Sequence, residues 1–232
     1  MKLNNPKGWF VTGTDTEVGK TMVTGELIHY LVGTGLRVAA MKPVASGCYE
    51  NEEGLWRNRD AEYLLAASNV ASEYKHVNPY AFPQAIAPHL AAARDDTNID
   101  IEVVLSCYQQ LQSQADAVVV EGVGGWQAPL NQEQTLADLA SLLDLPVVLV
   151  VGMRLGCLNH ALLTAASIKY YGANLVGWVA NSTQRPMFEL EANIRTLRSR
   201  LPAPCLGIIP YKTIEIMPGV LSEHLDWSLL FG

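Results

Sequence analysis

The feature that most constrains the fold of this chain is a glycine-rich segment near its beginning, residues 13–21 (GTDTEVGKT). It follows a short apolar run, 9–11, which predicts a buried strand, and it leads into 20–31, which predicts a helix. Five residues separate its two glycines, which are followed by Lys20 and Thr21, so it is a P-loop one residue longer than usual. Such a loop curls so that backbone N–H groups and the positive end of the helix face phosphate oxygens. Lys20 is then expected to reach the β- and γ-phosphates, and the Thr21 hydroxyl to bind Mg²⁺.

The rest of the chain alternates short apolar runs with helical patterns, which is typical of parallel strands joined by helical crossovers. The runs show no polar alternation, which indicates strands buried on both faces. Further strands are predicted at 38–41, 117–120, 147–151, 175–179 and 206–209, and further helices near 61–67, 101–115, 136–143, 159–170 and 190–201. No repeat, linker or change of composition marks a boundary. The sequence therefore predicts a single α/β domain over 1–232, with a mostly parallel central sheet and helices on both faces.

Composition and charge exclude several classes of protein. Hydrophobic residues make up 49% and charged residues 17% of the 232, which excludes a disordered, collagen-like or coiled-coil chain. Sixteen Lys and Arg against 23 Asp and Glu leave a net charge of −7 without a basic cluster, so neither nucleic acid nor a membrane surface is an expected partner.

The cysteines and the apolar segments indicate in which cellular compartment the protein is expected. The four cysteines are far apart, without metal-ligand spacing, and they predict small apolar fillers in a reducing compartment. The N-terminus lacks the apolar region of a secretory signal, and the apolar stretch 139–149 is interrupted and too short to cross a bilayer. A cytoplasmic location is therefore expected.

A P-loop needs a second oxygen ligand for its metal, and Glu121 is a candidate at the end of the run 117–120. Gly122, Val123 and Gly124 follow it, and the glycines would let this loop approach a nucleotide. From the residues alone, a solvated helix cap is the alternative role for Glu121.

Three more polar residues are candidates for the same edge of the sheet. Lys42 ends the run 38–41, so its ammonium is expected beside the P-loop, where it would neutralise charge that develops during phosphoryl transfer. A solvated surface lysine is the alternative. Ser46 supplies a hydroxyl in the loop that follows. For Asp60, a helix N-cap and a metal ligand are equally open from the residues alone.

The loop after the run 147–151 also has a distinctive composition. Gly152 and Gly156 leave its backbone open, and a helix is expected to begin near Cys157. Free N–H groups at a helix start favour an anion. An ordinary strand-to-helix connection whose N–H groups meet water is the alternative.

Taken together, four motifs resemble the dethiobiotin synthetase family: GTDTEVGKT at 13–21, MKPVASG at 41–47, EGVGGW at 121–126 and LGCLNHA at 155–161. The resemblance extends from about residue 8 to residue 211. It implies a homodimeric, ATP- and Mg²⁺-dependent cyclo-ligase of biotin biosynthesis. Such an enzyme makes the ureido ring of dethiobiotin from 7,8-diaminononanoate and CO₂ through a carbamate and a carbamic-phosphoric anhydride, and it releases ADP and phosphate.

The same resemblance implies roles for individual residues. The catalytic groups are Lys42 and Lys20. Residues implied to bind the triphosphate and its surroundings are Thr16, Glu17, Val18, Gly19, Lys20, Thr21, Met22, Gly122, Val123 and Gly124. The adenine is assigned to Asn181, Ile209, Pro210 and Tyr211, and Mg²⁺ to Thr21, Asp60 and Glu121. The carbamate is assigned to Lys42 and Ser46, with Thr16 also at the substrate. The substrate carboxylate is assigned to a loop contributed across the dimer interface: Leu155, Gly156, Cys157, Leu158 and Asn159.

Two other functions remain open at this point. A related P-loop ligase acting on a different diamine or acid would share these motifs. A nucleotide-dependent switch would hydrolyse ATP slowly and need an exposed apolar or basic face for a partner, which the acidic composition does not favour. The mass of the product from diaminononanoate, bicarbonate, Mg²⁺ and ATP distinguishes the three.

Overall fold

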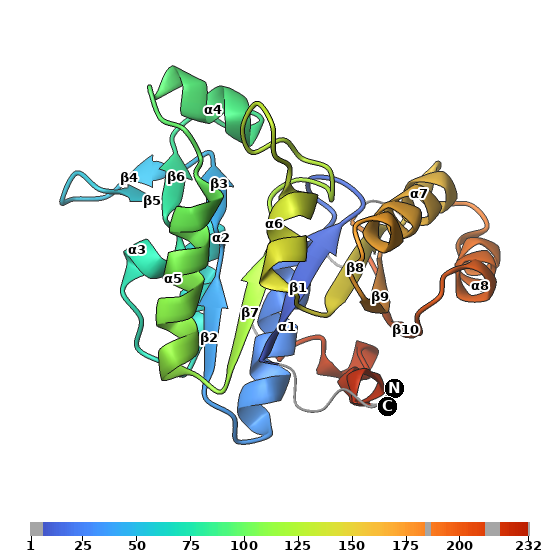
Figure 1. Ribbon diagram of the computed structural model, residues 1–232. Helices are drawn as coiled ribbons and strands as arrows, with labels where there is room; N and C mark the ends of the chain where they lie inside the picture. Colours follow the sequence, from blue (N-terminus) through green and yellow to red (C-terminus); the bar gives the residue numbers. More distant parts are fainter. Residues whose placement is uncertain (1–6, 184–186, 212–218, 232) are drawn as a thin grey trace.

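The computed structural model describes residues 7–183, 187–211 and 219–231, and its centre is a six-stranded sheet (Figure 1). The strand order is β10-β9-β8-β1-β7-β2, and every neighbouring pair runs parallel. The bounds are Gly8–Gly13 (β1), Val38–Met41 (β2), Ala117–Glu121 (β7), Val147–Gly152 (β8), Leu175–Asn181 (β9) and Cys205–Ile209 (β10). The six predicted strands are therefore confirmed, because uninterrupted apolar runs are buried on both faces here.

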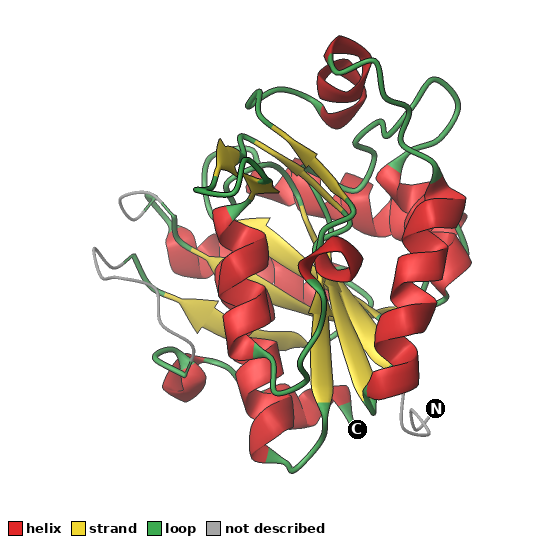
Figure 2. Cartoon of the chain, turned by 90° about the vertical axis from the view of Figure 1, so that its left-hand side faces the viewer, coloured by secondary structure: helices red, strands yellow, loops and turns green. Residues whose placement is uncertain are grey.

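Helices cover both faces of the sheet, as Figure 2 shows. The long helices span Lys20–Gly33 (α1), Arg59–Ala67 (α2), Ile101–Gln114 (α5), Leu136–Leu143 (α6), Cys157–Tyr170 (α7) and Leu190–Arg200 (α8). All six were predicted. The helices α1 and α2 pack on one face together with the C-terminal segment, and α5, α6, α7 and α8 pack on the other. None of the helices described is long and apolar enough to cross a membrane.

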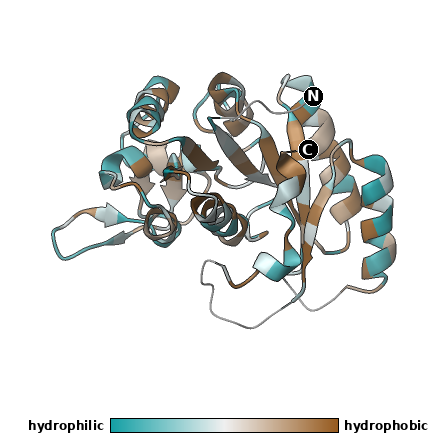
Figure 3. Ribbon diagram, turned by 90° about the horizontal axis from the view of Figure 1, so that it is seen from below, coloured by the Kyte–Doolittle hydropathy of each residue, from teal (hydrophilic) through white to brown (hydrophobic). Residues whose placement is uncertain are grey.

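The core is divided by the sheet into two sides, because successive strand residues point to opposite faces. In β1, Trp9 and Val11 pack toward α1, whereas Phe10 packs toward α5 and α6. Figure 3 shows the apolar strands in brown between helices whose outer faces are teal. The fold class predicted from the sequence, a mostly parallel α/β sheet with helices on both faces, is confirmed.

Several short elements lie outside the prediction. They are β3 (Val44–Ser46), β4 (Tyr49–Glu50), β5 (Trp56–Arg57), α3 (Tyr74–Val77), β6 (Tyr80–Phe82), α4 (Pro88–Arg94), η1 (Ser222–His224) and η2 (Trp227–Leu230). The strands β3 and β6 pair in parallel, and β4 and β5 form an antiparallel hairpin. Elements of two to seven residues carry no recognisable periodicity, so their sequence gives no signal. Most of them form a small layer beyond the carboxyl end of β2, at the upper left of Figure 1.

The register of the sheet brings the expected functional segments to one edge. Val11 pairs with Glu121, and Met41 pairs with Val120, so Lys42 follows β2 next to the end of β7. On the other side of β1, Gly152 pairs with Asn181. The carboxyl ends of parallel strands are where α/β sheets bind ligands. The P-loop therefore lies between the ends of β7 and β2 on one side and those of β8, β9 and β10 on the other.

Candidate active site

A cavity of about 900 Å³ lies at the carboxyl edge of the sheet. It is large enough for a nucleotide together with a small organic substrate. The predicted site residues that line it are Thr16, Glu17, Gly19, Lys20, Thr21, Met22, Lys42, Ser46, Asp60, Glu121, Val123, Gly124, Asn181, Ile209, Pro210 and Tyr211. The cavity walls thus include most of the residues implied by the resemblance.

The P-loop is held in place by neighbouring strand ends. Gly19 has φ +88°, and a Cβ added there would lie 2.1 Å from Asn181 Nδ2, so no other residue fits without displacement. The same Asn181 amide donates to the Val18 carbonyl at 2.8 Å. Thr14 N donates to the Val150 carbonyl at 3.0 Å. The loop is therefore fixed to both β8 and β9.

Lys20 begins α1 and is buried against the P-loop. Its ammonium donates to the Asp15 carbonyl at 3.0 Å. Burial, and next the positive charge of Lys42, lower the pKa of Lys20 to about 8. An anion with several charges at this position would favour the protonated form of Lys20.

The second group of polar residues surrounds the ammonium of Lys42. This side chain forms a buried ion pair with Glu121, and Asp60 Oδ2 lies 3.5 Å from Lys42 Nζ. Thr21 Oγ1 donates to Glu121 Oε1 at 2.9 Å, which links this cluster to the P-loop. Burial alone would lower the pKa of Lys42, but the two carboxylates outweigh it and the pKa is raised. Lys42 is therefore a buried cation in the wall of the cavity.

The oxygen atoms beside Lys42 fit a magnesium ion. Glu121 Oε2 is buried and has no hydrogen-bond partner among the described residues, and the Thr21 hydroxyl and Asp60 carboxylate are hard donors close by. Within that part of the chain, no three acidic, His or Cys side chains form a closed metal cage. This is the donor set expected for Mg²⁺, which takes one or two carboxylates and completes its shell with phosphates and water.

Asp60 is not the N-cap of α2, which corrects one of the two roles left open for it. The cap is Asn58, whose side chain accepts from Ala61 N at 3.2 Å. Asp60 lies in the first turn with its carboxylate half-exposed and directed toward Lys42. The metal-ligand role of Asp60 stays a prediction.

Two of the remaining predicted residues are close to the cavity but do not line it. Val18 is buried under the P-loop, and Gly122 packs between Leu136 and Phe10. Sequence reasoning missed further lining residues, which are Ala45, Asn58, Ala85, Ile86, Ala87, Pro88, Ser182, Thr183, Val220 and Leu221. Ser182 and Thr183 directly follow β9, so their position after a predicted strand could have identified them as candidates.

The loop between β8 and α7 does not line the cavity of its own chain. The residues Leu155, Gly156, Cys157, Leu158 and Asn159 are all absent from its walls. The Leu155 side chain is 93% exposed, and Gly156 has φ +96° directly before α7. Arg154 forms an ion pair with Asp15 of the P-loop. Capture of a carboxylate by this loop therefore stays a prediction.

The structure leads to a prediction for Glu121. Replacing it by glutamine should raise the Mg²⁺ concentration that gives half-maximal rate by about tenfold, because a neutral amide is a poorer ligand for a hard cation. Magnesium titrations at saturating ATP measure this directly. Glu102→Gln, at an exposed position of α5, is the matched control. Unchanged Mg²⁺ dependence with normal activity would remove Glu121 from the metal shell.

The comparisons with known proteins agree with this geometry. The family described as AAA domain matches residues 7–214. A protein of Xanthomonas oryzae named ATP-dependent dethiobiotin synthetase BioD is 51% identical over 89% of this chain and 92% of its own length. Proteins of the same name are 51% identical in Pseudomonas aeruginosa, over 94% of this chain and 95% of theirs, and 49% identical in Cellvibrio japonicus, over 97% of both.

Among solved structures, the fold is similar to that of a cell-division protein. MinD of Aquifex aeolicus superposes with a TM-score of 0.58 at 16% identity, covering 97% of this chain and 93% of MinD. The MinC:MinD complex of the same organism gives 0.55 at 17% identity, over 89% of this chain and 82% of the other. At this identity the likeness concerns the fold alone.

Proposed function

This chain belongs to the family of ATP-dependent dethiobiotin synthetases, and we propose that it closes the ureido ring of dethiobiotin from 7,8-diaminononanoate, CO₂ and ATP in biotin biosynthesis. The observation that carries this proposal is the buried cluster of Lys42, Glu121 and Thr21 beside the P-loop, inside one cavity. It supplies positive charge and metal ligands where the γ-phosphate of ATP would lie.

The proposed arrangement of ATP follows from the strand order. The residues assigned to the phosphates, Thr16 to Met22, surround the start of α1. The γ-phosphate then faces Lys42 at the end of β2. The base extends to the opposite side, toward Asn181 and the segment Ile209, Pro210 and Tyr211, all of which line the cavity.

The proposed reaction begins with the carbamate that one substrate amine forms with CO₂. Lys42 and Ser46 hold this carbamate; the Ser46 hydroxyl is buried and has no partner among the described residues, so it has a free hydrogen bond to offer. A carbamate oxygen attacks the γ-phosphorus, the bond to the β-phosphate oxygen breaks, and ADP leaves. The second amine then attacks the carbonyl of the anhydride, the ring closes, and phosphate departs with the shared oxygen.

The contributions of the chain are positioning and charge. Lys20 contacts phosphate oxygens in the ground state, whereas Lys42 faces the oxygens on which charge develops. Magnesium, held by Thr21, Asp60 and Glu121 when bound, supplies charge neutralisation at the phosphates. No side-chain nucleophile is required: Cys48 is buried, and burial raises the pKa of its thiol.

The product of the reaction tests this function. Incubation with 7,8-diaminononanoate, bicarbonate, Mg²⁺ and ATP should yield a cyclic urea that contains one carbon more than the substrate, with ADP and phosphate formed in equal amounts. Mass spectrometry with ¹³C-bicarbonate identifies the added carbon. Hydrolysis of ATP without the labelled product would refute the proposal and favour a nucleotide-dependent switch.

We also propose that the protein works as a cytoplasmic homodimer, in which one protomer's loop at 155–159 holds the carboxylate of the substrate bound to its partner. Two observations are consistent with this arrangement: Leu155 is exposed, and the loop does not line the cavity of its own chain. No side chain caps α7 at Gly156, and Cys157 N donates to the Arg154 carbonyl at 2.9 Å, so the N–H groups of Leu158 and Asn159 are the ones proposed to bind the carboxylate.

A substrate analogue tests this carboxylate site. Replacing the carboxylate by a neutral amide should raise KM for the diamine by about tenfold or more, since charge-assisted hydrogen bonds are lost. Arg154→Ala should have a smaller effect, because Arg154 is paired with Asp15. Sedimentation at assay concentration measures the oligomeric state. An amide with unaltered KM would contradict the site, and a fully active monomer would contradict its cross-subunit form.

A further inference from the structure

A buried carboxylate in α1 is left unused by the proposed mechanism. Glu26 is 1% exposed and lies within roughly two helical turns of Lys20. Its Oε1 accepts from Leu221 N at 3.2 Å, and its Oε2 has no hydrogen-bond partner among the described residues. A carboxylate in such surroundings is costly. Among the described residues, the one hydrogen bond to its carboxylate comes from the C-terminal segment, residues 219–231.

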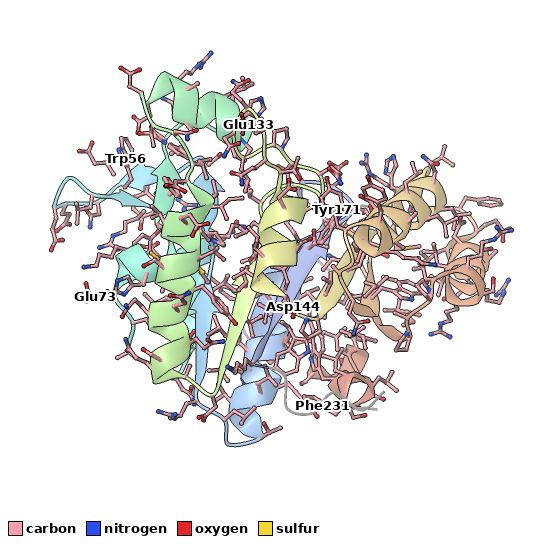
Figure 4. All side chains as sticks on the ribbon, in the orientation of Figure 1. Trp56, Glu73, Glu133, Asp144, Tyr171 and Phe231 are labelled. Carbon is pink, nitrogen blue, oxygen red and sulfur yellow. The ribbon has the colours of Figure 1, made fainter. Side chains whose placement is uncertain are left out.

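Most of the C-terminal segment is held by apolar packing and by the edge of the sheet. Leu225, Trp227 and Leu230 are buried in the core that contains α1. Asp226 N donates to the Leu206 carbonyl of β10 at 2.7 Å. Phe231, labelled at the lower right of Figure 4, contacts the ring of Trp9 with their centroids 5.7 Å apart. These contacts fix residues 225–231. In the earlier part of the segment, Leu221 packs in the same core, and its N–H also donates to Glu26 of α1.

That earlier part forms a wall of the cavity. Val220 and Leu221 line it together with Met22 of α1, Ile209 at the end of β10 and Tyr211 just after that strand. This end is separated from Lys42 by the P-loop, because β9 and β10 lie on the opposite side of β1 from β7 and β2. A triphosphate whose γ-phosphate faces Lys42 therefore places its base against this apolar wall.

We propose that Glu26 is a positioning residue for the base of the nucleotide: its carboxylate fixes Leu221 so that Val220 and Leu221 form one face of the base pocket. The proposal rests on the ATP-dependent function and on the orientation of ATP given above. Glu26 does not touch the nucleotide itself; it is not among the residues that line the cavity. Glu26 should therefore affect the binding of the base but not the binding of the phosphates.

The test compares ATP with inorganic triphosphate, which has the phosphates but no base. Glu26→Met removes the acceptor at similar volume, and it should raise Kd for ATP by about tenfold while Kd for triphosphate stays unchanged. Turnover at saturating ATP should stay within about twofold of wild type, since the reacting groups are untouched. Glu26→Gln keeps an oxygen that can accept from Leu221 N, so it should bind ATP within about threefold of wild type.

A second pair of variants keeps the test decisive if Glu26→Met does not fold. Leu221→Ala removes part of the wall directly and should weaken the binding of ATP but not that of triphosphate. Leu229 is half-exposed in the same segment and lies outside the cavity, so Leu229→Ala should change neither affinity. Wild-type ATP affinity in Glu26→Met or Leu221→Ala, or equal weakening of both ligands, would overturn the proposal. Absence of ATP-dependent product from the wild-type protein would instead refute the proposed function.

Discussion

Lys42→Gln is expected to lower kcat by about 100-fold or more while ATP still binds with close to wild-type affinity. The ammonium of Lys42 is buried between Glu121 and Asp60, at the end of the cavity where the transferred phosphoryl group would lie. Glutamine keeps a hydrogen-bond donor of similar length but carries no charge. The contact is strongest in the transition state, so the loss should appear in kcat rather than in Kd.

Steady-state rates and calorimetric ATP binding measure the two quantities separately. Lys75→Gln is the matched control, since Lys75 is exposed and pairs only with Glu73 in the described part of the chain. Thermal unfolding monitors the stability of Lys42→Gln, which leaves Glu121 without its buried cation. A kcat within tenfold of wild type would show that Lys42 has no catalytic role.

Lys20→Gln should weaken both binding and turnover, with Kd for ATP raised by about 100-fold. The wild-type protein should also lose ATP affinity as pH rises above about 8, by up to about tenfold per pH unit. The sign follows from the pKa of Lys20, which burial and Lys42 lower to about 8. Above that pH the free protein holds Lys20 neutral, so binding of the polyanion must take up a proton.

ATP titrations from pH 7 to 9.5 measure this slope, and Lys20→Gln should abolish it. The exposed Lys169→Gln serves as control and should retain the wild-type profile. A pH-independent wild-type affinity would contradict the assignment of Lys20 as the group that titrates.

How far the sequence predicts the fold depends on the length and regularity of each element. The six central strands are continuous apolar runs, and the six long helices each span 8 to 14 residues, so both are recognisable. The short elements on either side of α2, in 44–57 and 74–94, are not, because the short strands are stabilised by contacts with one another rather than by their own pattern. The stretch 74–94 contributes Ala85, Ile86 and Pro88 to the cavity, which therefore has a wall that the sequence does not reveal.

The site residues that could be predicted are those that belong to a motif next to the end of a strand. Lys20, Lys42 and Glu121 each follow a recognisable strand, and parallel strands bring their carboxyl ends together. Glu26 carries no such signal, since a glutamate within a helix usually faces solvent. It is buried here only because a segment nearly 200 residues later packs over it.

The ion pairs around Lys42 couple the effects that substitutions in this site have on stability. Two ammonium groups, Lys20 and Lys42, are balanced by two carboxylates, Glu121 and Asp60, so the four formal charges sum to zero. Removal of one partner of a buried pair leaves the other uncompensated, at a cost of about 3–5 kcal/mol, whereas paired changes cost less. The buried pair of Lys42 and Glu121 is therefore one unit for stability: replacing both residues together should destabilise the protein less than replacing either one alone.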